Sequence, residues 1–152
     1  MEIKACTIMG FGKFHRRSFS FSDGIHVIYG ENEAGKTTLR TFLVSMLFGI
    51  DRKRGAASKK DEFHKYQPYM GGIYGGSLDF SFQGEDYQIQ RDFSNGKDIV
   101  IYETAMGKKV LEGQEPSGNL FSMTKEGFLQ TLCISQGAMK TDKSLSQIIW
   151  RI

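Results

Sequence analysis

The sequence contains little cysteine and no apolar stretch long enough to cross a membrane. Its 152 residues include two cysteines, Cys6 and Cys133, which lie far apart and have neither a CxxC partner nor clustered histidines. This pattern argues against a disulfide framework and indicates no zinc site. The first residues lack the uninterrupted apolar core of a secretion signal, and the apolar stretch 42–50 is too short for a bilayer. We therefore expect a cytoplasmic protein in a reducing environment.

The sequence also lacks a strong charge imbalance, internal repeats and low-complexity tracts. Twenty lysines and arginines against 17 aspartates and glutamates give a net charge of +3. This mildly basic balance permits contact with nucleic acid, but phosphate binding alone would account for it. The length suits one domain, which would bury about 68–70% of the surface that its unfolded chain exposes.

The most informative motif is GENEAGKT at residues 30–37, which fits the phosphate-binding pattern G-x-x-x-x-G-K-[ST] without a mismatch. It lies between a predicted strand at 25–29 and a predicted helix at 36–48, the order that such a loop requires. The alternative is a glycine-rich turn with a solvent-exposed lysine. The strand, loop and helix order disfavours that alternative.

The chemistry of this loop suits a nucleoside triphosphate. Gly30 and Gly35 would let the backbone approach phosphate and adopt left-handed dihedrals, while the loop amides and the helix N-terminus point at the anion. The charge of Lys36 is worth about 4 kcal/mol at about 4 Å from a phosphate oxygen near a surface. The Thr37 hydroxyl is the expected Mg²⁺ ligand, and Thr38 would cap the helix or touch the alpha phosphate. The predicted ATP-binding residues of the loop are Gly30, Glu31, Asn32, Glu33, Ala34, Gly35, Lys36, Thr37 and Thr38.

Around the loop, alternating apolar residues predict strands at 2–9 and 18–21. Residues 51–69 predict a charged loop with five lysines and arginines in its first ten positions. Two interpretations of this basic loop stay open, a mobile solvated loop and a contact with the DNA phosphate backbone.

From residue 71 the pattern changes to an antiparallel meander of short strands. The predicted strands are 77–82, 87–91, 99–103 and a weak one near Val110. The apolar run 99–102 before Glu103 imitates a Walker B strand. Its place in a meander, and the glutamate where an aspartate is expected, favour an ordinary strand of the lobe.

The C-terminal part predicts a link at 112–119, a helix at 124–132, the segment CISQG, and a helix that begins near Asp142 or Leu145. That last helix has no stop signal before Ile152. We expect the chain to end inside an element.

Four segments together carry a family resemblance: GFGKF at 10–14, DGIHVIYGENEAGKTTL at 23–39, YMGGIYGGSLDF at 69–80 and YQIQRDF at 87–93. They resemble the N-terminal half of the ABC-type ATPase head of SMC, SbcC, RecF and RecN proteins, with the greatest likeness to the YhaN-like bacterial AAA proteins of DNA repair. The resemblance covers nearly the whole chain.

The resemblance implies an α/β fold, the N-terminal lobe of a P-loop NTPase with an antiparallel β-rich insert, incomplete without its C-terminal half. Residues 1–152 would form one lobe. Its parts would be the strands, phosphate loop and first helix (1–50), the basic loop (51–70), the antiparallel lobe (71–111) and the Q-loop region leading towards a coiled coil (120–152).

Two further site residues follow from the resemblance. Gln136 in CISQG stands where the family has the Q-loop glutamine, which reaches Mg²⁺ and the attacking water; otherwise it is an ordinary exposed glutamine. Lys13 resembles a position from which relatives send a basic side chain to the nucleotide, although many carry arginine one place earlier, where this sequence has Gly12. The resemblance therefore implies Lys36 and Gln136 as catalytic residues and Thr37 and Gln136 as metal ligands.

The family's remaining catalytic motifs are not recognisable in this sequence. In the family the ABC signature, the Walker B aspartate with its catalytic glutamate, and the switch histidine belong to the C-terminal half. The first hypothesis is therefore half of an ATPase that acts as an ATP-driven clamp, with little activity alone. Its expected partners are its own C-terminal half and a second head, with DNA and a nuclease subunit as further candidates. The alternatives are a compact P-loop kinase, or a nucleotide-binding module without catalysis.

Overall fold

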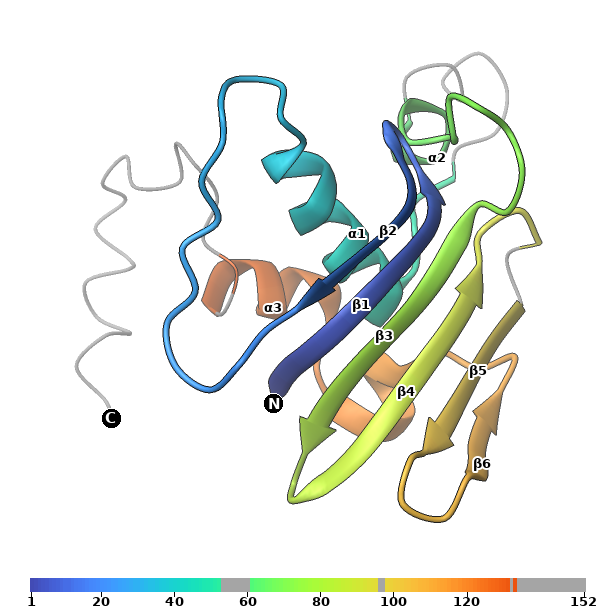
Figure 1. The fold of residues 1–152 in the computed structure, drawn as a ribbon. Helices are drawn as coiled ribbons and strands as arrows, with labels where there is room; N and C mark the ends of the chain where they lie inside the picture. Colours follow the sequence, from blue (N-terminus) through green and yellow to red (C-terminus); the bar gives the residue numbers. More distant parts are fainter. Residues whose placement is uncertain (53–60, 96–97, 132, 134–152) are drawn as a thin grey trace.

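The computed structural model describes residues 1–52, 61–95, 98–131 and 133 (Figure 1). Its elements are β1 (Glu2–Phe11), β2 (Phe14–Ser20), α1 (Lys36–Phe48), α2 (Glu62–Lys65), β3 (Gly75–Phe82), β4 (Glu85–Asp92), β5 (Asp98–Glu103), β6 (Lys108–Glu112), the π-helical turn η2 (Ser117–Phe121) and α3 (Lys125–Thr131). Gln136, the predicted last helix and most of the basic part of the loop 51–69 lie outside the described residues. Within the described part, no helix is long and apolar enough to cross a membrane.

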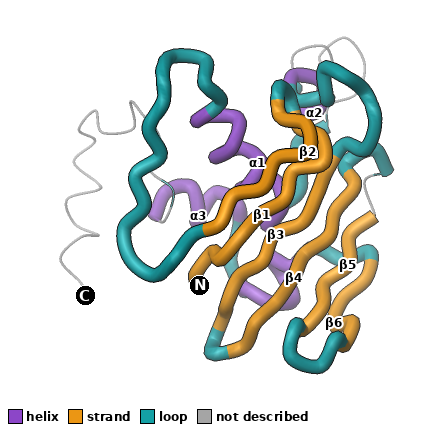
Figure 2. The backbone as a smooth tube through the Cα atoms, viewed as in Figure 1, coloured by secondary structure: helices purple, strands orange, loops and turns teal. Residues whose placement is uncertain are grey.

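In the described part of the chain, six strands form one antiparallel sheet in the order β2-β1-β3-β4-β5-β6. Figure 2 shows α1 and α3 on one face of this sheet. The predicted meander is confirmed, and it is continuous with the N-terminal strands because β1 pairs with β2 on one side and β3 on the other. Glu103 ends β5, which pairs with both β4 and β6. The run before it is therefore a strand of the lobe, as predicted.

The core lies between the sheet and α1, and aromatic rings dominate it. Phe11 at the end of β1 is fully buried; its ring meets Phe42 of α1 edge-on at 5.4 Å and stacks on Tyr66 at 5.0 Å between ring centroids. Tyr74 completes the cluster, its hydroxyl donating to the carbonyl oxygen of Phe63 at 2.8 Å. Burial raises the pKa of this phenol, which stays protonated as a donor. Such ring pairs contribute about 0.5–1.5 kcal/mol each beyond their buried area.

The predicted helix at 36–48 coincides with α1, and the predicted helix at 124–132 corresponds to α3. The predicted strand at 25–29 is wrong. This segment forms no strand, and Ile25, Val27 and Tyr29 are 97%, 86% and 95% exposed. A strand needs a neighbour that pairs with its backbone amides and carbonyls. Both edges of β1 are already paired, so the sheet offers this segment no edge beside β1.

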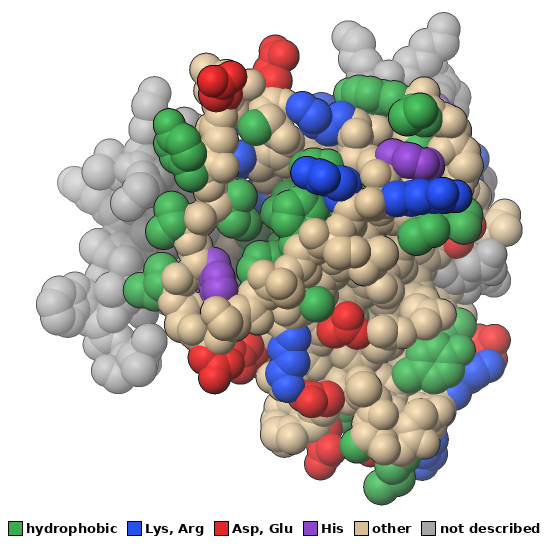
Figure 3. Space-filling view, in the orientation of Figure 1, with side chains coloured by type: hydrophobic (Ala, Val, Ile, Leu, Met, Phe, Trp, Pro, Cys, Tyr) green, Lys and Arg blue, Asp and Glu red, His purple; other side chains and the backbone are tan. Residues whose placement is uncertain are grey.

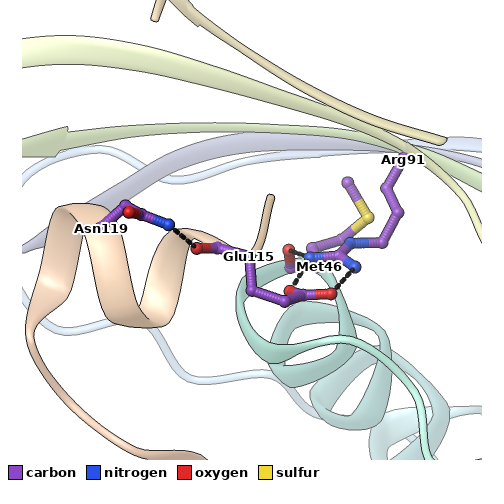
Figure 4. Close-up of polar contacts among 4 residues, drawn as sticks. All are labelled: Met46, Arg91, Glu115 and Asn119. Carbon is purple, nitrogen blue, oxygen red and sulfur yellow. Dashed lines mark hydrogen bonds and ion pairs between the residues drawn. The ribbon is translucent and has the colours of Figure 1, made fainter. Parts of the chain in front are cut away.

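A buried arginine ties three parts of the fold together (Figure 4). The side chain of Arg91, on β4, is 4% exposed and forms a bidentate ion pair with Glu115. Its Nη1 and Nη2 atoms donate to the two carboxylate oxygens at 2.9 Å and 2.7 Å. Its Nη2 atom also donates to the carbonyl oxygen of Met46, in the last turns of α1. Gly49 caps α1 at φ 79°, and a Cβ there would stand 3.1 Å from the Glu115 carboxylate. The ion pair therefore holds the chain before η2 against the C-terminal end of α1.

We predict that Glu115→Ala destabilises the fold by about 1–3 kcal/mol, because it leaves a buried guanidinium without its carboxylate. Glu112→Ala is the matched control, since Glu112 pairs with Lys109 on the surface and its loss should cost less than about 1 kcal/mol. Urea unfolding followed by circular dichroism measures both. Equal stability losses in the two variants would contradict a structural role for the Arg91 pair.

Candidate functional site

The phosphate loop leads directly into the N-terminus of α1. Gly35 precedes the helix at φ 109° and Glu33 lies at φ 65°, so left-handed residues alternate with ordinary ones. Such an alternation is the backbone pattern of anion-binding nests, and in this loop the Ala34 amide donates to the carbonyl oxygen of Glu31 at 3.2 Å. A Cβ on Gly35 would stand 2.6 Å from the ring of Phe14, so a glycine is required there. Gly30 is not among the residues with positive φ, which corrects the expectation of a left-handed dihedral at that position.

The ammonium group of Lys36 lies at the mouth of this loop. Its Nζ atom donates to the carbonyl oxygens of Gly30 at 2.5 Å and Glu31 at 2.8 Å. The lysine is exposed. Its charge is therefore held by two carbonyl dipoles, without a carboxylate among the described residues, and remains open to an incoming anion.

Lys13 reaches the same loop from the turn between β1 and β2. Its Nζ atom donates to the carbonyl oxygen of Glu33. The turn itself lies against α1, since a Cβ on Gly12 would be 3.2 Å from the methyl group of Thr38. The structure thus brings the ammonium groups of Lys13 and Lys36, which are far apart in the sequence, to the same loop. Both groups donate to backbone carbonyl oxygens within residues 30–33.

The N-terminus of α1 is open to a ligand. In the described part of the chain, no side chain caps it, and its first turn contains no acidic residue. A helix N-terminus carries unpaired amides and roughly half a positive charge. Thr37 is exposed on this first turn, and Thr38 is partly buried against the β1–β2 turn.

The residues present fit a polyphosphate with a divalent cation. Two ammonium groups, the nest and the open helix end are all donors, which suits several negative charges on a small group. The exposed Thr37 hydroxyl is a hard oxygen ligand of the kind that Mg²⁺ uses together with phosphate oxygens. Gln136, the second predicted metal ligand, lies outside the described residues.

Two residues that the sequence analysis did not select also border the site. The ring of Phe14 packs against Gly35 and so restricts where the backbone of the loop can lie. Arg40 lies one helical turn after Lys36, in a groove of about 240 Å³ that both residues line. Their spacing, i to i+4 on a predicted helix, is the sequence signal that could have found Arg40.

The fold and this loop define the N-terminal lobe of a P-loop NTPase. The particular family follows from residues 5–149, which match the family profile described as "AAA domain", so the chain belongs to that family.

Curated relatives agree with this assignment. The uncharacterized protein YhaN of Bacillus subtilis is 44% identical over 80 residues, covering 52% of this chain and 7% of that protein. The DNA double-strand break repair Rad50 ATPase of Pyrococcus abyssi is 26% identical, covering 100% of this chain and 18% of the relative. The Rad50 ATPase of Archaeoglobus fulgidus is 30% identical over 73% of this chain and 11% of the relative. The chain therefore spans less than a fifth of these relatives.

A solved structure from work on SMC ATPases aligns with 100% of this chain and with 93% of its own chain, at 12% identity and a TM-score of 0.49. That score is too low for an argument of its own.

We predict that Lys36→Ala weakens ATP binding by well over tenfold, because it removes the full charge at the mouth of the loop. Titration of a fluorescent ATP analogue measures the affinity. Lys109→Ala is the control, since that lysine lies on β6 and pairs with Glu112. Unchanged affinity in Lys36→Ala would contradict a working phosphate loop.

Proposed function

We propose that this chain is the ATP-binding half of an ATPase head of the chromosome-maintenance and DNA-repair kind. The observation that carries the proposal is the convergence of Lys36 and Lys13 on the loop backbone at the open N-terminus of α1. The similarity to Rad50 ATPases supports the same class.

ATP and Mg²⁺ are the proposed ligands. Lys36 would hold the beta and gamma phosphates, with the amides of the nest beside it. Lys13 would add a second positive charge at the side of the loop. Thr37 would supply one oxygen to Mg²⁺, and Gln136 is proposed to orient the attacking water and contact the metal. The bound Mg²⁺ would neutralise charge that develops on the phosphates during hydrolysis.

The site is proposed to be split between two polypeptide segments. Support comes from the exposed apolar segment 25–29, which precedes the phosphate loop without any strand beside it among the described residues. Figure 3 shows hydrophobic side chains along this segment, at the left of the view. Exposed apolar patches of this kind mark interaction surfaces. We infer that the C-terminal half of the head supplies the missing strand and the catalytic carboxylates.

A second head is the further proposed partner, with ATP between the two heads as a conformational clamp. An engaged pair would contact the gamma phosphate and a separated pair would not, so hydrolysis would release the heads. This differential contact is the physical basis of the clamp.

DNA is a proposed partner as well, and a nuclease subunit a further candidate. Support comes from the edge strand β2, whose basic side chains are exposed: His15, Arg16 and Arg17. Basic side chains gather over this end of the sheet (Figure 3). Such a cluster suits the phosphate backbone of DNA. A location in the cytoplasm accords with these partners.

The alternatives find less support. A compact P-loop kinase usually continues its phosphate-loop helix with parallel strands, whereas every strand pair in the described part of this chain is antiparallel. A nucleotide-binding module without catalysis would also bind ATP. It differs from half of an ATPase head in that adding a C-terminal half would not raise its ATP turnover.

We predict that the isolated chain binds ATP but hydrolyses it poorly, because the carboxylates that activate water are supplied from elsewhere. Adding the C-terminal half should raise turnover by on the order of a hundredfold or more, the usual worth of a catalytic base. Phosphate release, measured with and without that half, is the test. Robust hydrolysis by the isolated chain would refute the split site.

We also predict that Val27→Asp weakens association with the C-terminal half by tenfold or more, because a charge replaces an apolar side chain buried in the complex. The isolated chain should unfold at an unchanged temperature, since Val27 is 86% exposed. Val110→Asp is the matched control at another exposed valine, on β6. Sedimentation of the mixed halves gives the affinity. If both variants bind as tightly as the wild type, segment 25–29 is not the interface.

A further inference from the structure

Tyr66 contacts both of the elements that bring lysines to the phosphate loop. It directly follows α2, at the end of the sheet where β1 turns into β2 (Figure 1). The residue is 7% exposed, and its ring stacks on Phe11 of β1. Its backbone and its hydroxyl group bond in two different directions. Tyr66 is therefore a fixed point of the core from which neighbouring segments can be held.

The backbone of Tyr66 holds the turn that carries Lys13. Tyr66 ends α2, and the last carbonyls of a helix lack partners within the helix. The Tyr66 carbonyl oxygen accepts a hydrogen bond from the amide of Gly12 at 2.7 Å. The carbonyl oxygen of Gly12 in turn accepts from the amide of Tyr69 at 3.1 Å. Both backbone polar groups of Gly12 are thus bonded to residues 66–69, which fixes the direction in which Lys13 leaves the turn.

The side chain of Tyr66 holds α1. The Oγ1 atom of Thr41 donates to the hydroxyl oxygen of Tyr66 at 3.3 Å, and both residues are buried. Thr41 lies one helical turn after Thr37, on the helix whose first turn also carries Lys36. A tyrosine side chain has only two rotatable χ angles, so its ring acts as a stiff spacer between the backbone and the hydroxyl group. Tyr66 therefore joins the Lys13 turn to the helix of Lys36.

We propose that Tyr66 is a positioning residue that sets the turn bearing Lys13 relative to the first turn of α1. The ammonium groups of Lys13 and Lys36 donate to carbonyl oxygens of the same loop. The attraction between a cation and a phosphate falls with distance, so both cations act on one phosphate chain only when their spacing suits it. This inference rests on the proposed function, in which both lysines contact the phosphates of ATP.

The experiment titrates a fluorescent ATP analogue, with Mg²⁺ present, into the full 152-residue chain and its variants. Tyr66→Phe keeps the ring and the carbonyl bond to Gly12 but removes the hydroxyl group that Thr41 bonds. It should weaken binding roughly fivefold, the worth of about one hydrogen bond. Lys13→Ala should weaken binding by roughly tenfold or more, because it removes a full charge. In the Lys13→Ala background, Tyr66→Phe should cost less than about twofold, since no ammonium group is left on the turn to misplace.

Tyr74→Phe is the matched control. Tyr74 is a buried tyrosine of the same aromatic cluster, and its hydroxyl group also makes one hydrogen bond, to the carbonyl oxygen of Phe63. Losing that bond should lower the stability to urea about as much as Tyr66→Phe does, because each variant loses one buried hydrogen bond. The affinity of Tyr74→Phe for the analogue should stay within about twofold of the wild type.

Thr41→Val is a second variant, which removes the same bond from the side of α1. It should weaken binding by the same factor as Tyr66→Phe. The double variant Tyr66→Phe/Thr41→Val should lose no more than either single variant, because only one bond is broken. Equal losses in the three variants would therefore assign the effect to the bond between the two hydroxyl groups.

Three results would overturn the inference. One is an equal loss from Tyr66→Phe with and without Lys13, which indicates a general weakening of the fold. Another is an affinity loss in Tyr74→Phe as large as that in Tyr66→Phe, and the third is unchanged binding in both Tyr66→Phe and Thr41→Val. Failure of the proposed function looks different, because the wild-type chain would then bind no analogue, or would bind it equally well without Lys13.

Discussion

The packing of α1 against the sheet is the constraint on which the rest of the structure depends. The middle of this helix is buried against β1 through Phe42 and Phe11, while its N-terminus is exposed at Lys36 and Thr37. The two features are compatible because the helix begins at a left-handed glycine that no side chain caps within the described residues. The core therefore fixes the direction of the helix, and the loop needs only to bring its amides to the helix end.

Electrostatics at this end are arranged for a ligand that carries negative charge. Lys13 and Lys36 both donate to carbonyl oxygens of the loop, which offset their charge only partly. By contrast, Arg91 and Lys125 pair with carboxylates, those of Glu115 and Asp51. A cation that bonds to carbonyl dipoles is more available to an incoming anion than a cation paired with a carboxylate, because the anion need not displace the carboxylate.

Much of this architecture follows from local sequence patterns. The bounds of α1 follow from its apolar spacing and the glycines at both ends, and the hairpin turns follow from Gly84 and Gly107. What could not be predicted depends on partners distant in the sequence. Examples are the pairing of β1 with β3, the bond from Arg40 to Cys133 and the ion pair of Arg91. The local sequence pattern indicates which face of a helix or strand such a residue lies on, but it does not indicate which distant residue it contacts. The predicted strand at 25–29 failed for the same reason, since its composition favours a strand but supplies no edge to pair with.

The exposed segment 25–29 and the phosphate loop are consecutive, and this has a mechanical consequence. The segment ends at Tyr29, and the next residue, Gly30, offers its carbonyl oxygen to Lys36. A strand that paired with the segment would therefore order the backbone up to the atom that holds the lysine. A phosphate that drew Lys36 away from Gly30 would act on the same backbone from the other side. Because such coupling is reciprocal, a partner that makes the loop more receptive to nucleotide must itself bind more tightly when nucleotide is present. In the proposed split head, the nucleotide therefore influences the association of the two halves directly, through the backbone of Gly30.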